Sequence, residues 1–257
     1  YRIRALRSFD YARAGDLGGY IEKERNLSHK GNCWVGGNAK VFNNAKVYGD
    51  AKVDSKARVS DNARVSDNAR VSDNARVSDN ARVYGNASVY HKSKVFDNAK
   101  VFDRAILLDK ARVYGEARVY GDAMVYGNAG VYGNAVVYGN ACIHNIANVF
   151  GRADVSDARI GGVAKVHGKA TIYGKAKVYR DACVARKEDI IWFSPVGDWM
   201  ETLTVYKRWN GKLLVTVEDI ANTVDDFLEI SSTLHSKKVY REYQLLIEVA
   251  KSRILGE

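Results

Sequence analysis

An aliphatic residue returns at every sixth position from Val35 to Val155 without a gap. Only Leu107 and Ile143 replace valine in this series. Self-similarity at a fixed short period is typical of solenoids, in which each repeat is one structural unit stacked on its neighbours. The period therefore predicts a solenoid for this part of the chain.

Each hexad predicts one short strand and one corner. Alanine stands two positions before nearly every aliphatic residue, as Ala39 stands before Val41. Successive side chains of a strand point to opposite faces, so we expect Ala39 and Val41 to point inward and Lys40 outward. Pairs such as Gly49-Asp50 and Asp61-Asn62 supply the backbone freedom that a corner requires. Three hexads then make one triangular coil.

About twenty-six hexads predict between eight and nine coils, about 40 Å tall at ~4.8 Å per strand layer. After Val155 the spacing drops once to five, at Ile160, and then resumes, which predicts a tightened corner near residues 157–162. We expect three parts in the chain. They are an N-terminal cap (1–34), a hexapeptide-repeat β-helix (35–185) and a small α+β domain (186–257).

The two ends carry signals of their own, because an open solenoid end exposes strand edges and an apolar lumen. At the back, Asn210-Gly211 predicts a hairpin, a helix is expected behind Thr223, and a second helix has an apolar face from Val239 to Ile254. At the front we expect a plug of apolar side chains: Leu17, Tyr20, Ile21, Leu27 and Trp34.

The aliphatic-x-x-x-Ala-x pattern over residues 35–185 resembles the hexapeptide-repeat left-handed β-helix family, whose best-known members are acyl-CoA-dependent acyltransferases. The segments 16–24, 26–28 and 31–35 resemble more narrowly the start of hexapeptide proteins encoded by phages and prophages, which are often labelled acyltransferases on fold alone. The resemblance implies an all-β solenoid, a single-stranded left-handed parallel β-helix with a small C-terminal α+β domain. It also implies a viral or prophage origin.

Positive charge belongs to the repeat region. Of the formal net charge of +10, residues 35–185 carry 23 Lys and Arg against 14 Asp and Glu, whereas residues 186–257 carry 10 against 12. Residues eighteen apart should stack on one face of a three-sided coil. The first face then carries a basic ladder of Lys40, Arg58, Arg76, Lys94 and Arg112. The second face carries a basic ladder of Lys46, Arg64, Arg82, Lys100 and Arg118.

Aromatic side chains project beside both ladders, among them Phe96, Tyr114, Tyr84 and Phe102. Basic residues alternating with aromatic ones are suited to a phosphodiester backbone and to stacked bases, so nucleic acid is one candidate partner. The alternative is that these are ordinary outer-face residues of a sheet. On that interpretation the charges are partly neutralised by the corner carboxylates of Asp61, Asp67, Asp73 and Asp79.

The third face begins with Lys52 and Arg70 but then becomes apolar. Its later outward residues are Ile106, Leu108, Met124, Tyr126, Cys142 and His144. A contiguous apolar patch usually marks a partner or self-association site. We expect a protein partner at Ile106, Leu108, Met124, Tyr126 and His144, most simply a second copy of the chain. The alternative is that the C-terminal domain folds back over this face.

Signals for catalysis and cofactors are weak. Acyl transfer needs a general base in a cleft, typically His, yet the hexads leave no spare residues for a loop over His91, His144 or His167. We therefore assign no catalytic residue, no metal ligand and no cofactor. No run is apolar enough to span a membrane, and the three cysteines form no pair motif, which together favour the cytoplasm of a bacterial host.

Ser-Asp-Asn-Ala-Arg-Val occurs four times in tandem between Ser60 and Val83. Such identity suits a spacer or a multivalent surface better than an active site. The sequence thus favours a non-enzymatic, phage-type solenoid scaffold that binds or sequesters a partner, for example a component of host machinery or host defence. An acyl-CoA-dependent acyltransferase and a nucleic-acid-binding protein stay open as alternatives.

Overall fold

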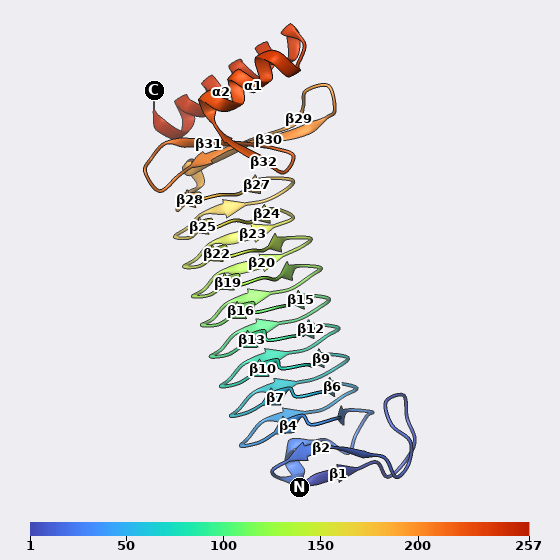
Figure 1. Cartoon of the computed structure of the whole chain (residues 1–257). Coiled ribbons are helices and arrows are strands. Elements are labelled where there is room, and N and C mark those ends of the chain that lie inside the picture. Colours follow the sequence, from blue (N-terminus) through green and yellow to red (C-terminus); the bar gives the residue numbers. More distant parts are fainter. Residues whose placement is uncertain (257) are drawn as a thin grey trace.

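The computed structural model describes residues 1–256 and shows a rod-shaped parallel β-solenoid with a small domain at its C-terminal end (Figure 1). Twenty-six short strands, β3 to β28, follow one another at the hexad spacing. The third face holds nine of them, one for each coil. The predicted fold class is confirmed.

Three sheets make the three faces, and each coil strand pairs in parallel with the strand eighteen residues away, or seventeen residues away across the shortened hexad between Val155 and Ile160. The first face contains β4 (Lys40–Val41), β7 (Arg58–Val59), β10 (Arg76–Val77), β13 (Lys94–Val95), β16 (Arg112–Val113), β19 (Gly130–Val131), β22 (Asn148–Val149), β25 (Lys165–Val166) and β28 (Cys183–Val184). The second face contains β5 (Lys46–Val47), β8 (Arg64–Val65), β11 (Arg82–Val83), β14 (Lys100–Val101), β17 (Arg118–Val119), β20 (Val136–Tyr138), β23 (Asp154–Ser156) and β26 (Thr171–Ile172). The third face contains β3 (Trp34–Val35), β6 (Lys52–Val53), β9 (Arg70–Val71), β12 (Ser88–Val89), β15 (Ile106–Leu107), β18 (Met124–Val125), β21 (Cys142–Ile143), β24 (Arg159–Ile160) and β27 (Lys177–Val178).

The lumen is filled by the alanine and aliphatic positions of the hexads. These residues form one continuous buried cluster from Cys33 to Val184, and nearly all of them, including Leu107, have no solvent exposure. Full burial of an aliphatic side chain contributes roughly 1.5–3 kcal/mol, so the stacked lumen is the main source of stability.

The corners adopt left-handed backbone conformations. Asp61, Asp79 and Asp97 have φ of 61°, 57° and 56°, and Gly115 takes the next place along the same corner with φ of 70°. The predicted tightened corner lies at Asp157, with φ of 54°, between β23 and β24. The coil register continues past it, because β21 still pairs with β24 and β22 with β25.

The N-terminal segment adds two strands to the first face, β1 (Arg2–Arg4) antiparallel to β2 (Leu17–Ile21), followed by a short 3-10 helix η1 (Glu24–Asn26). The expected plug is only partly formed, since Leu17 is 52% and Tyr20 is 37% exposed. The register explains this result. Tyr20 pairs with the outward Lys40, whereas Ile21 pairs with the inward Val41 and contacts the core.

The C-terminal domain is an antiparallel sheet covered on its outer side by two helices (Figure 1). It follows a 3-10 helix η2 (Lys187–Asp189) and comprises β29 (Ile190–Val196), β30 (Glu201–Lys207), β31 (Leu213–Val217), β32 (Ile220–Thr223), α1 (Val224–Leu234) and α2 (Lys237–Leu255). The Thr223 hydroxyl accepts from the Asp226 N–H at 3.2 Å and caps α1, as the sequence predicts.

This domain closes the C-terminal end of the lumen. Tyr206, fully buried, joins the solenoid core together with Ile190 and Leu214. Its hydroxyl also accepts a hydrogen bond from the Tyr179 N–H at 3.0 Å, so it satisfies a strand edge of the last coil. Arg208 binds the Asp181 carboxylate with three contacts of 2.6–3.1 Å. The C-terminal domain is therefore held on the last coil by apolar packing, a hydrogen bond and an ion pair.

Candidate functional site

The first basic ladder is continuous in the structure. Consecutive residues of this ladder are direct register partners on neighbouring strands of the first face, from Lys40 and Arg58 to Lys94 and Arg112. All five side chains are exposed. Adjacent strands lie about 4.8 Å apart, so the ladder offers one cation per strand layer. It ends where Gly130 and Asn148 take the same position.

The second basic ladder has the same construction. Register pairing runs from Lys46 and Arg64 through Lys100 to Arg118, and it ends where Val136 and Asp154 follow. Four of the five side chains are exposed and Lys100 is half-buried. Two parallel rows of cations therefore cover two faces of the same coils.

Within residues 1–256, none of the ten ladder side chains forms an ion pair or a side-chain hydrogen bond. Basic residues elsewhere do find acidic partners, such as Arg104 with Asp122 at 2.6 Å and Lys52 with Asp54 at 3.1 Å. Like charges directly opposite each other on neighbouring strands are destabilising. The ladders thus hold an unneutralised electrostatic repulsion, which the other interactions of the solenoid must offset.

The corner carboxylates have another use. The Asp61, Asp67, Asp73 and Asp79 side chains each accept a hydrogen bond from a backbone N–H one coil further on, at 2.9–3.4 Å. A hydrogen bond from the Ser60 hydroxyl and one from the Asp79 N–H hold the pKa of Asp61 below its usual value, although burial opposes them. These acids stabilise the turns of the coil and form no contact with the ladder cations within ion-pair distance.

The aromatic side chains beside the ladders stack on one another. The second face holds a stack of four rings at 4.8–5.2 Å, with interplanar angles of 1–10°: Tyr84, Phe102, Tyr120 and Tyr138. The first face holds a stack of five rings at 4.8–4.9 Å, with angles of 4–8°: Phe96, Tyr114, Tyr132, Phe150 and His167. The sequence interpretation identified outward aromatics but missed this mutual stacking. Their eighteen-residue spacing is the signal that predicts it.

The apolar patch predicted on the third face is partly accessible. Met124 is 39% exposed, and Ile106 and Leu108 are half-buried. Tyr126 is stacked on His144 at 5.3 Å, and burial together with its contact to Cys142 raises the pKa of Tyr126 to about 12. The rings of Tyr126 and His144 thus also pack within the coil, while both side chains stay half-buried like Ile106 and Leu108, so the partner site at these five residues stays a prediction.

The C-terminal domain reaches only the end of the third face. The Tyr179 hydroxyl donates to Asp219 in the β31–β32 turn at 3.0 Å, and Lys177 pairs with Glu218 and Asp219. Burial, and then this hydrogen bond, raise the pKa of Tyr179. His144 touches the same group, because its ring meets that of Tyr179 edge-on at 5.8 Å. The domain packs beside the sequence-predicted patch without covering Met124.

Each histidine weighed as a catalytic base has a structural contact. His91 lies at a corner, where its Nδ1 accepts from the Asp109 N–H at 3.1 Å. His167 stacks on Phe150 and lies 3.5 Å from the Cys183 Sγ. In residues 1–256 no group of His, Cys, Asp and Glu is arranged to hold a metal ion, and no helix is long and apolar enough to cross a membrane.

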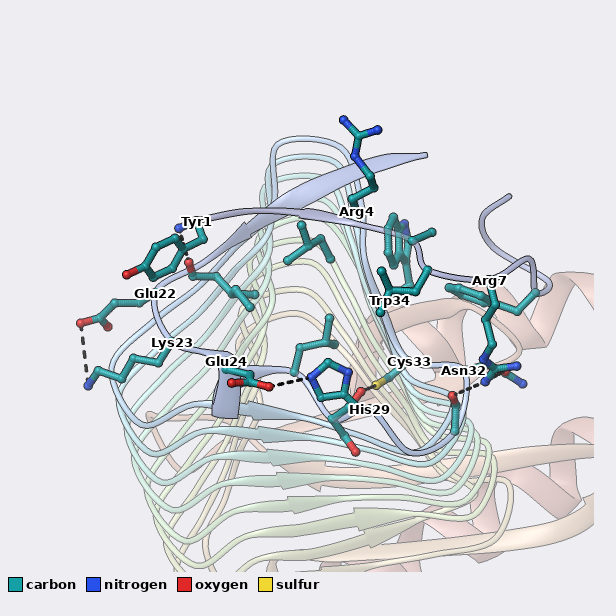
Figure 2. A pocket seen from close by; sticks show the side chains of 18 residues that line it. Tyr1, Arg4, Arg7, Glu22, Lys23, Glu24, His29, Asn32, Cys33 and Trp34 are labelled. Carbon is teal, nitrogen blue, oxygen red and sulfur yellow. Dashed lines mark hydrogen bonds and ion pairs between the residues drawn. The ribbon is translucent and has the colours of Figure 1, made fainter. Parts of the chain in front are cut away.

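The N-terminal end of the lumen opens into a cavity of about 790 Å³ (Figure 2). Ile3, Ile21 and Leu27 line it and pack against the solenoid core. Figure 2 shows charged and polar side chains joined in pairs around it, among them Glu22 with Lys23 at 3.8 Å, Glu24 with His29 at 3.1 Å, and Arg7 with Asn32 at 3.0 Å. The cavity is thus an apolar hollow at the open mouth of the lumen, away from the ladders.

Comparison with known families concerns the repeats. The YdcK beta solenoid repeat matches residues 57–73, 63–78, 69–82, 75–91, 111–127 and 117–132. No curated protein matches the chain. The matched segments lie in the ladder-bearing coils and agree with the parallel sheets of the structure. These residues therefore carry repeats of the β-solenoid kind.

Proposed function

We propose that the chain is a non-enzymatic solenoid scaffold that binds a linear polyanion along its two basic ladders. One observation carries the proposal: ten Lys and Arg side chains stand in two rows, and none has an acidic partner within residues 1–256. A bound polyanion replaces repulsion between stacked cations with attraction. It also releases its own condensed counterions, which is the main driving force of such binding.

The unbroken coil supports a binding role over acyl transfer. Corner after corner from β3 to β23 is built from the same short turn, and no loop stands over a histidine. His91, His144 and His167 each contribute to the coil itself. One nitrogen of His91 and one of His167 are engaged in such contacts, and a general base needs a nitrogen that points at a bound substrate, which favours the scaffold.

The test compares two variants that lose the same charge. In the ladder variant Arg64, Arg82, Lys100 and Arg118 are changed to Thr, which this chain already has at Thr171 on the same face. In the control variant Lys237, Lys238, Arg241 and Arg253, exposed on α2, are changed to Gln. Binding of labelled heparin and of a labelled DNA duplex is measured by fluorescence anisotropy. We expect the ladder variant to lose about 10-fold or more in affinity and the control to change little. Equal losses in both variants would contradict the proposal.

Self-association through the third face is a second candidate. The first and second faces repel their own copies, whereas the third face carries Ile106, Leu108 and Met124 in place of cations. Two copies therefore approach at lowest electrostatic cost through this face. Light scattering after size-exclusion chromatography tests it: a dimer that becomes a monomer on Met124→Lys supports the idea, and a wild-type monomer at high concentration removes it.

The proposal also covers where the protein comes from and where it acts. The likeness of residues 16–35 to the start of phage and prophage hexapeptide proteins supports a viral origin, with action on a host component in the bacterial cytoplasm. Nucleic acid is the most abundant linear polyanion of that compartment. Host nucleic acid, or machinery assembled on it, is the component that this surface is suited to engage.

A further inference from the structure

We infer, on the basis of the proposed function, that the polyanion is a nucleic acid duplex held through its phosphates, and that single strands are not bound by base stacking. The inference starts from the ring stacks. Tyr84, Phe102, Tyr120 and Tyr138 use their ring faces on one another at 4.8–5.2 Å. The five rings of the first face do the same at 4.8–4.9 Å.

A base does not fit between such rings. Stacked bases are spaced by about 3.4 Å, so a base between two rings needs roughly 6.8 Å. The observed spacing is about 2 Å short of that, and every inner ring is held on both sides. Only the terminal rings, such as Tyr84 and Tyr138, have one face without an aromatic neighbour in their stack. Proteins that bind single strands combine a basic groove with open ring faces. Here the basic part is present and the open ring faces are not.

The Lys and Arg side chains of the two ladders suit a stiff and highly charged rod. A duplex carries one negative charge per about 1.7 Å of axis, so a row with one cation per ~4.8 Å faces a strongly negative potential along its whole length. Its persistence length of about 50 nm means that it lies along a straight solenoid without losing conformational freedom. A flexible polysaccharide or an unstacked single strand pays an entropic cost to be straightened on the same rod.

Recognition of this kind is independent of sequence. Contacts with phosphates fix a protein on a duplex but read no bases, and base reading requires side chains in a groove. The ladder residues lie on flat sheet faces, with no described helix or loop beside them to enter a groove. We therefore expect similar affinity for duplexes of unrelated sequence.

The experiment measures the affinity of the full chain for four labelled probes at one salt concentration. The probes are a DNA duplex, a second duplex of unrelated sequence, a pyrimidine-rich single strand of equal length, and heparin. The same titrations are repeated with the ladder variant and with a ring variant, in which all four rings of the second-face stack, Tyr84, Phe102, Tyr120 and Tyr138, are changed to Ala. Thermal unfolding checks that both variants are folded.

We expect both duplexes to bind alike and about 10-fold or more tightly than the single strand. We also expect the ring variant to keep its affinity for the duplexes and the ladder variant to lose it. A single strand that binds more tightly than the duplexes and is weakened in the ring variant would overturn the inference, and so would a preference for heparin. The proposed polyanion function survives both of these outcomes. Failure to bind any of the four probes overturns the proposed function together with the inference.

Discussion

The rings of Tyr84 and Phe102 lie 4.8 Å apart and within 1° of parallel. The same register places Arg82 beside Lys100 on the same two strands. Neighbouring coils therefore attract each other through the stacked rings and repel each other through the stacked cations at the same spacing. Stacked rings stabilise the outer face, and this offsets part of the cost of stacked cations.

Removal of an inner ring should therefore destabilise the solenoid. Phe102→Ala loses two stacking contacts, each worth about 0.5–1.5 kcal/mol, so the free energy of unfolding should fall by about 1–3 kcal/mol. Phe42→Ala is the control, because Phe42 precedes Ser60 on the first face and has no ring above it. Urea denaturation measures both variants, and an equal loss in the two would show that stacking contributes nothing.

The lumen offers a sharper comparison at two neighbouring leucines. Leu107 is fully buried, whereas Leu108, the next residue, is half-exposed on the third face. Leu107→Ala should cost about 2–5 kcal/mol through lost burial and a cavity. Leu108→Ala should cost less than half of that. If denaturation gave similar values for both, the inward and outward assignment of the hexad would be wrong.

A corner aspartate tests the left-handed turns. Asp79, with φ of 57°, accepts from the Asp97 N–H at 3.2 Å. Asp79→Ala loses this hydrogen bond and the one from the Ser78 hydroxyl, and it adds strain of about 1–2 kcal/mol at a left-handed position, whereas Asp79→Gly loses the two hydrogen bonds alone. The alanine variant should therefore be the less stable of the two by about 1 kcal/mol in thermal or chemical denaturation. The reverse order would refute this account of the corners.

The sequence predicted the fold because the lumen imposes strict chemistry on every hexad. Only Ala and a branched or similar aliphatic residue fit inside, so the period and the inward face are visible without coordinates. The tightened corner at Asp157 and the cap of α1 at Thr223 were equally local signals. The front plug was partly wrong because the pairing of Tyr20 with Lys40 depends on how β2 joins the first face, which no local pattern states.

The surfaces were harder to predict, since outward positions accept many residues. Both basic ladders were found from the eighteen-residue spacing, but the use of the corner carboxylates by backbone N–H groups was not visible. The sequence predicts a partner surface that includes Tyr126 and His144, and this stays a prediction. In the structure their rings contact each other, and that contact depends on side-chain direction as well as spacing.

The docking of the C-terminal domain should depend on pH through Asp181. The Arg208 guanidinium, by its hydrogen bonds, holds the pKa of this partly exposed carboxyl below its usual value. A lowered folded-state pKa stabilises the fold above the unfolded value of about 3.9, and this stability is lost as the pH falls through the folded-state pKa.

Asp181→Asn should therefore lower the free energy of unfolding at neutral pH, by about 0.5–1 kcal/mol after solvent screening. The difference between wild type and variant should shrink as the pH falls below about 4. Denaturation followed by the fluorescence of Trp192, Trp199 and Trp209, all in this domain, reports the effect. A difference that stays constant down to low pH would show that the ion pair does not contribute.

The most direct test of the central claim is the salt dependence of duplex binding by the intact chain and by the Arg64/Arg82/Lys100/Arg118→Thr variant. The logarithm of the affinity falls with the logarithm of the salt concentration by about 0.9 for each phosphate neutralised. If the ladder holds the duplex, the variant's slope should be shallower by about 3–4 than the wild-type slope. Identical slopes would show that these four cations touch no phosphate, and the ladders would then be ordinary outer faces of a solenoid.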